Sequence, residues 1–274
     1  RMEQARWAGM RHAVKRYLAR TGVRPAPLAY QRLVKNVRQR AEKVLNRHGS
    51  TLGSWKTIAV EGGQANVVNA AAWTGGLITI NRPLIDLAFQ IGRVVDAAQG
   101  NQTKIDKGLY NLASYRRGKG QAPLALQNPL SAKARRVAEG IVAGVVMHEM
   151  GHAANGHLQM RDAKLWLPGQ KGPSAAERGK VQRAKERQAD DFMAQLGALG
   201  GTHTPSAIPY FNYYMHIANP RWNAKRPLMI ADISSHPLNA KRYEASRKTL
   251  TKMLPKNRAV NSLPELSKNL IIQP

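Results

Sequence analysis

The middle of the chain carries the feature that most constrains its fold, a long segment that is almost free of charge. Residues 132–158 read "AKARRVAEGIVAGVVMHEMGHAANGHL", and from Ile141 to Gln159 the only formally charged residue is Glu149. Ser131 precedes the segment and is a suitable N-cap, because its hydroxyl can accept a hydrogen bond from the first turn. A helix that is apolar on every face is stable only when other elements cover it. We therefore expect a buried central helix with the rest of the fold built around it.

Glycines within this segment indicate how closely its neighbours approach. Gly140, Gly144 and Gly151 each destabilise a helix by about 1 kcal/mol relative to alanine. We therefore expect these positions to lie where another element packs directly against the backbone of the helix.

The surrounding sequence predicts a small sheet and several further helices. Strands are expected in "WKTIAVEGG" and "GGLITIN", and a helix opened by Pro83 is expected in "RPLIDLAFQIGRVVDAA". Residues 100–127 are rich in Gly, Lys, Arg and Gln, which indicates a long loop or insertion. Further helices are expected in "AKERQADDFMAQLGALGG", around Ile208–Ile217, and after "SSHPLNAKR". The predicted fold class is α+β and predominantly helical.

The distribution of charge divides the chain into three predicted units. Residues 1–50 contain thirteen Lys and Arg against two Glu, with apolar residues at helical spacing. They predict a basic helical N-terminal layer, whose charged face either is simply solvated or binds a polyanion. The main domain is predicted over residues 51–254, including the insertion 100–127, and a C-terminal tail over 255–274.

The net charge of the whole chain predicts an anionic partner. Lys and Arg number 43 against 16 Asp and Glu, which leaves a charge of +27. RNA or a ribonucleoprotein, an anionic membrane surface, or an acidic protein would each fit. No segment has the roughly 20 apolar residues that a membrane span needs. The start at Arg1 rather than Met favours removal of a leader, and the basic charge favours a mitochondrial location over a bacterial periplasm.

A possible metal site lies within the central helix. The chain has no cysteine, so any metal must be bound by His, Asp or Glu. His148 and His152 are four residues apart and share one helix face, with Glu149 one step round, in the HExxH arrangement. The alternative is a pair of solvated or core histidines. Burying two imidazoles and a carboxylate in an uncharged helix is costly without a partner, and a zinc ion would satisfy all three.

The third ligand has to come from elsewhere in the sequence. His157 lies nine residues after His148, which places it near the opposite face of a continuous helix. Glu186 is the preferred candidate because Asp190 would share its helix face and could approach the same helix. Glu177, beside a segment broken by Gly and Pro, is the rival.

Four blocks of the sequence resemble a known family. "NAAAWTGGLITINRPLID", "VVMHEMGHAANGH", "ERQADDFMAQLGALGG" and "SSHPLNAKR" occur in this order and span most of residues 66–247. They resemble the gluzincin peptidases, which include the CAAX prenyl proteases, the HtpX-like heat-shock proteases and their soluble stress-protease relatives. The insertion at 100–127 and the basic ends have no counterpart in that pattern, and this chain lacks the transmembrane helices of the membrane-spanning members.

The resemblance implies a role for each matched residue. It implies that His148, His152 and Glu186 bind one zinc ion per chain, that Glu149 is the general base, and that Asp190 orients a ligand histidine. A zinc ion with an open position lowers the pKa of a bound water and polarises a carbonyl.

The last block adds two residues to the implied site. In the family the matched His and Arg, here His236 and Arg242, lie near the active site. Either could stabilise the oxyanion that forms on the attacked carbonyl. Alternatively, His236 could occupy the open position of the metal and keep the enzyme latent.

Together these patterns predict a zincin-like, zinc-dependent endopeptidase that cleaves unfolded or extended protein segments. The substrate is expected to add a strand to an exposed sheet edge at Gly75–Ile80, with Gly75, Gly76, Leu77 and Ile78 as its contacts. That strand could instead be an ordinary member of the sheet. The alternative function is a catalytically silent or additional role as a basic assembly factor that binds RNA, the ribosome or another polyanion.

Overall fold

The computed structural model describes residues 2–47, 55–157, 175–200, 204–218 and 248. The helix expected after "SSHPLNAKR", the predicted tail 255–274, and both His236 and Arg242 lie outside these residues. The division into three units stays a prediction.

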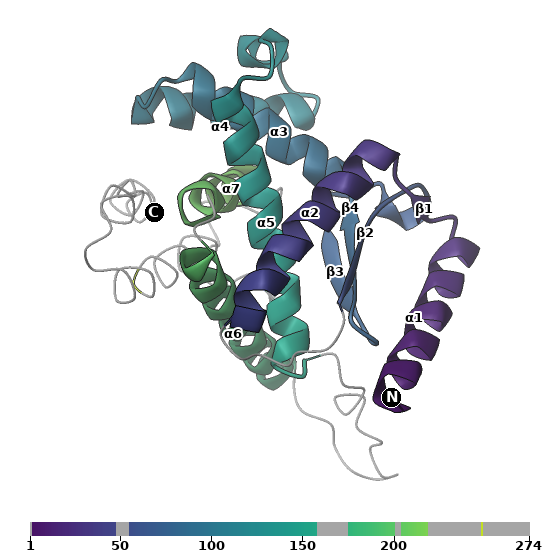
Figure 1. The fold of residues 1–274 in the computed structure, drawn as a ribbon. Helices are drawn as coiled ribbons and strands as arrows, with labels where there is room; N and C mark the ends of the chain where they lie inside the picture. The colour runs from purple at the N-terminus through teal and green to yellow at the C-terminus, as the bar shows by residue number, and fades with distance from the viewer. Residues whose placement is uncertain (1, 48–54, 158–174, 201–203, 219–247, 249–274) are drawn as a thin grey trace.

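Within the described residues the chain forms seven α-helices and a four-stranded sheet (Figure 1). The helices are α1 (Met2–Arg20), α2 (Leu28–Arg47), α3 (Arg82–Ala97), α4 (Gln102–Arg116), α5 (Ala132–Ala154), α6 (Ala175–Leu199) and α7 (Thr204–Ala218). The strands are β1 (Arg24–Pro25), β2 (Lys56–Glu61), β3 (Ala70–Trp73) and β4 (Leu77–Asn81), and 3-10 turns occupy Gly63–Ala65 and Leu124–Gln127. A mostly helical α+β architecture with a small sheet is thereby confirmed.

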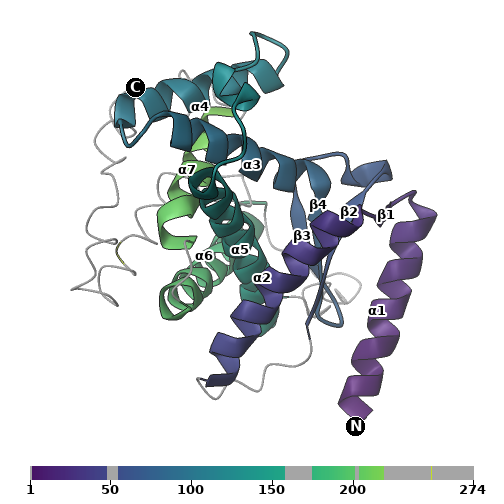
Figure 2. The ribbon, with the colours of Figure 1, turned by 45° about the horizontal axis from the view of Figure 1, so that its top comes forward.

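The sheet separates two layers of helices. Its strand order is β1-β2-β4-β3, with β2 parallel to β4 and the other pairs antiparallel. Ile78 and Ile80 of β4 belong to the principal core, whereas Leu77 belongs to a second cluster with Val60 and with Leu18 of α1. This alternation follows from the two-residue period of a strand. As Figures 1 and 2 show, α1 lies on one side of the sheet and α2, α3 and α5 lie on the other.

The prediction of an exposed edge strand at Gly75–Ile80 is wrong. Leu77 and Ile78 begin β4, an interior strand because β2 and β3 pair with its two sides. The outer strand at this side of the described sheet is β3, which the sequence analysis missed. Its alanines, Ala70–Ala72, have low strand propensity, so tertiary pairing rather than local preference determines this strand.

Gly75 and Gly76 are not exposed at an edge either. They form the turn between β3 and β4, with φ angles of 81° and 70° that favour glycine. A Cβ atom on Gly75 would lie 2.9 Å from both the Met10 Cβ and the Trp7 carbonyl oxygen. The helix α1 therefore covers this turn.

The expected central helix is α5. The other helices that contact it are α2, α3, α6 and α7, and the sheet contacts it through β3 and β4 (Figure 2). Residues 140–147 are all buried, and the Ser131 hydroxyl accepts the hydrogen bond of the Ala134 N–H at 3.0 Å. Two of its glycines lie where other helices approach: Gly144 adjoins the Ile208 side chain of α7, and Gly151 adjoins the backbone of Ala189 on α6.

The loop predicted over residues 100–127 is a second correction, because α4 occupies more than half of it. Ile105, Leu109 and Leu112 recur at spacings of four and three and are buried in the principal core. Asn101 caps the helix by accepting the Lys104 N–H at 3.0 Å. A loop was predicted because polar residues and glycine outnumber these three apolar residues in the segment.

The basic N-terminal segment forms two helices, α1 and α2, which lie on opposite sides of the sheet rather than in one layer, and α2 contributes to the principal core. Val34, Val37, Ala41 and Val44 of α2 are buried in the principal core, and α2 contacts α5, β2 and α6. No helix in the described ranges is both long enough and apolar enough to cross a membrane.

Candidate metal centre

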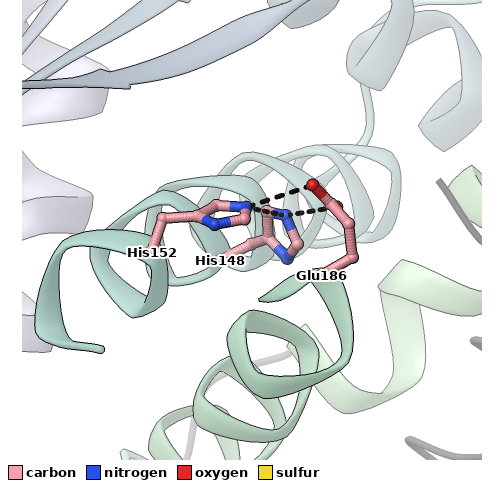
Figure 3. Close-up of side chains that lie close together, drawn as sticks. All are labelled: His148, His152 and Glu186. Carbon is pink, nitrogen blue, oxygen red and sulfur yellow. Dashed lines mark hydrogen bonds and ion pairs between the residues drawn. The ribbon is translucent and has the colours of Figure 1, made fainter. Parts of the chain in front are cut away.

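Helices α5 and α6 bring three potential metal ligands together. His148 and His152 are one turn apart on α5, and Glu186 approaches them from α6 (Figure 3). One ligand atom from each residue lies within 4.8 Å of the others. The structure thus places the three residues that the sequence analysis selected in one group that can hold a metal ion.

The spacing of the ligand atoms suits a small tetrahedral ion. His148 Nε2 lies 3.1 Å from His152 Nε2 and 3.3 Å from Glu186 Oε2, while His152 Nε2 lies 3.4 Å from Glu186 Oε1. Ligands at bond lengths of about 2.0–2.1 Å in a tetrahedron are about 3.3 Å apart. The two distances to Glu186 involve its two different carboxylate oxygens, and an ion among the three side chains could be bound by either oxygen.

The hydrogen bond of His148 to Asp190 also fits a metal. Its Nδ1–H donates to Asp190 Oδ1 at 2.9 Å, and in the neutral ring this leaves the lone pair on Nε2. This lone pair faces the carboxylate of Glu186 at 3.3 Å, and two acceptors so close repel each other unless a proton or a cation lies between them. Glu186 and Asp190 are each only 6% exposed, so positive charge at the group would also offset their burial.

A close approach of the two helices positions these side chains. Gly151 lies between the two histidines in the sequence, and Ala189 lies between Glu186 and Asp190. A Cβ atom on Gly151 would lie 2.9 Å from the Ala189 Cα and 3.0 Å from its carbonyl oxygen. Glycine at this position lets α6 come near enough for its carboxylates to reach the imidazoles.

Glu149 follows His148 on α5 and is half-buried. Its helix contacts β3, the outer strand of the described sheet. Its role as a base stays a prediction.

His157 does not belong to the ligand group, but it contacts one of the ligands from the other side. Its Nδ1 lies 3.0 Å from His152 Nδ1, and its Nε2 lies 2.8 Å from Gln188 Oε1 on α6. Burial lowers the pKa of His157 below its ordinary value, although the Gln188 hydrogen bond acts in the opposite direction. The lowered pKa favours the neutral form of the His157 imidazole, which makes both of these contacts.

This contact differs from the prediction, in which a continuous helix placed His157 near the opposite face. The helix ends at Ala154, and Gly156, with φ 69°, turns the chain back toward it. The signal was present as Asn155-Gly156, since glycine after a helix commonly adopts this left-handed conformation.

Three further candidate residues cannot be located relative to this group. The side chain of Glu177, and His236 and Arg242 entirely, lie outside the described residues, so their roles stay predictions. Comparisons with protein-family models, with curated proteins and with solved structures gave no match. Functional inference for this chain therefore depends on the geometry of the group itself.

Proposed function

We propose that this protein is a zinc-dependent endopeptidase of the gluzincin type. The observation that carries the proposal is the convergence of His148, His152 and Glu186 at 3.1–3.4 Å, with Glu149 next to the first histidine. Two imidazoles and a carboxylate suit zinc, whereas Ca²⁺ and Mg²⁺ prefer oxygen ligands throughout.

The ligand group would hold zinc through His148 Nε2, His152 Nε2 and Glu186. Zinc bound there would lower the pKa of a water molecule toward neutrality and polarise the carbonyl of the scissile peptide bond. The Glu149 carboxylate would accept the proton of the attacking water and deliver it to the nitrogen of the leaving amine. Asp190 would keep His148 in the tautomer that offers Nε2.

The outer strand β3 is the part of the described sheet best suited to bind an extended substrate. Its side away from β4 has no strand partner among the described residues, and α5 contacts it. An extended peptide that paired with β3 through main-chain hydrogen bonds would run beside α5 and would need no particular sequence. This assignment replaces the interior strand that begins at Leu77.

Peptidase activity and zinc binding can be tested together. Metal-free protein reloaded with zinc should cleave unfolded casein, and Glu149→Gln should keep its zinc but lose turnover by about 100-fold or more, because a general base contributes that much. Glu139→Gln is the matched control, since Glu139 is a half-buried glutamate of the same helix outside the ligand group. Unchanged turnover in Glu149→Gln would contradict the catalytic proposal.

A second candidate function, binding of RNA or another polyanion, is favoured by one face of α2. Its exposed cations are Arg32, Lys35, Arg40, Lys43 and Arg47. The only carboxylate of this helix, Glu42, is partly buried and pairs with Arg38 at 3.6 Å. The exposed charged residues of this helix are therefore all cations, which favours contact with phosphates.

This second candidate predicts RNA binding that weakens steeply as salt rises from about 50 to 200 mM. Replacing Lys35, Arg40 and Lys43 with glutamate should reduce both the affinity and its dependence on salt. Equal RNA affinity of this variant and the unmodified chain would exclude α2 as the binding face.

A further inference from the structure

The end of α5 places His157 directly behind a ligand histidine. The His157 N–H donates to the His152 carbonyl at 2.8 Å, and the Gly156 N–H donates to the Ala153 carbonyl at 3.1 Å. Together with the positive φ of Gly156, these bonds form a Schellman motif, in which the residue after the glycine packs against the last turn. Here that contact joins two imidazoles, whose ring centres are 5.2 Å apart.

The donor and acceptor in the contact between His157 and His152 can be assigned by starting from Gln188, the other partner of His157. The Gln188 Oε1 can only accept, so the Nε2 of His157 carries a proton and donates to it. With that proton on Nε2, the Nδ1 of the His157 ring is placed to accept a hydrogen bond from the Nδ1–H of His152, 3.0 Å away. In a neutral His152 ring with its proton on Nδ1, the lone pair is on Nε2, the atom that faces His148 and Glu186.

Each of the two ligand histidines therefore has a hydrogen-bond partner at its Nδ1, but the two partners differ chemically. Asp190 fixes the tautomer of His148 with a buried carboxylate, and His157 fixes that of His152 with an imidazole that Gln188 orients. Both Gln188 and Asp190 belong to α6, the helix that also supplies Glu186.

We propose that His157 is a positioning residue of the metal centre, which holds the His152 ring and its tautomer so that Nε2 faces the metal. This inference rests on the proposed function only in that it assumes a metal at the ligand group. Because the Schellman motif is made by the backbone and Gly156, replacing the His157 side chain should leave the helix end in place.

The experiment uses the full chain, stripped of metal and titrated with zinc and, separately, with cobalt. His157→Leu should bind zinc about 10- to 100-fold more weakly, as is typical when a partner of a ligand histidine is removed. Its cobalt complex should show an altered visible absorption spectrum, which reports ligand geometry. His157→Asn should recover most of the affinity and the spectrum, because the asparagine oxygen can occupy the place of Nδ1 and accept the same hydrogen bond.

Two further variants complete the design. Gln188→Glu, which keeps the acceptor, should bind zinc more tightly than Gln188→Leu, which removes it. His12→Leu changes an exposed histidine of α1 and should leave zinc affinity unchanged.

The outcomes separate this inference from the metal centre itself. If His157→Leu matches the unmodified chain in zinc affinity and cobalt spectrum, the positioning role is wrong while the metal centre stands. If His157→Leu fails to fold, the inference is tested with His157→Asn and with the two variants Gln188→Glu and Gln188→Leu. Weak binding by His157→Asn, or equal binding by both Gln188 variants, would then overturn the inference. An unmodified chain that binds neither metal would overturn the proposed function instead.

Discussion

The α5–α6 contact and the exposed face of α2 hold their polar groups in opposite ways. Between α5 and α6 a few titratable side chains are buried, and His148 contacts both Glu186 and Asp190 within 3.3 Å. On α2, five cations face solvent with no carboxylate among them. The net charge of +27 points to the second region, whereas the geometry points to the first. Buried polar groups need specific partners and so carry more functional information than solvated charge.

The largest effect should come from forcing the two helices apart. Gly151→Val places atoms against the backbone of Ala189, so α6 must shift and carry Glu186 and Asp190 with it. We expect the free energy of unfolding to fall by about 1–3 kcal/mol and zinc affinity to fall about tenfold or more. Chemical unfolding and zinc titration measure the two effects.

The control for this substitution is Gly9→Ala. Gly9 lies on the exposed side of α1, and a Cβ atom there would meet nothing within 4 Å. This control should be neutral or slightly stabilising. Zinc affinity in Gly151→Val equal to that of Gly9→Ala would show that the ligand group does not depend on the close helix approach.

A smaller effect is expected from Asp190→Asn. Asparagine can still accept the His148 Nδ1–H, but it lacks the charge that strengthens the bond. Zinc affinity should fall about tenfold, at the lower end of the range for such partners. Asp106→Asn, at a half-buried aspartate of α4 outside the ligand group, should leave zinc affinity unchanged. Equal affinities in the two variants would remove Asp190 from the account of the metal centre.

The smallest effect on stability and zinc should come from α2. Glutamate at Lys35, Arg40 and Lys43 changes exposed positions only, and each such substitution usually alters stability by no more than about 0.5 kcal/mol. Zinc content should equal that of the unmodified chain. A clear loss of zinc in this variant would mean that the basic face of α2 and the metal centre are coupled.

The ligand group could be predicted from the sequence because local spacing determines it. His148 and His152 share a face of one helix, and Glu186 and Asp190 share a face of another. Burial of the first helix was also readable, since residues 141–147 are apolar or glycine. Only the meeting of the two helices had to be inferred, and Gly151 was a local sign of it.

The features that the sequence analysis missed depend on non-local pairing or on one backbone angle. β3 is a strand because β4 pairs with it, although Ala70–Ala72 favour no strand. The position of His157 follows from the positive φ of Gly156, which ended a helix that had been expected to continue. For α4, a short apolar stripe was outweighed by the polar residues around it.

The zinc content of three forms of the chain tests the ligand assignment most directly. The unmodified chain, Glu186→Ala and Glu177→Ala are stripped of metal, reloaded with zinc, desalted and analysed for bound metal. We predict one zinc per chain in the unmodified form and in Glu177→Ala, and strongly reduced zinc in Glu186→Ala. Full zinc in Glu186→Ala, with loss in Glu177→Ala, would contradict the assignment, and an unmodified chain without zinc would contradict the metal centre altogether.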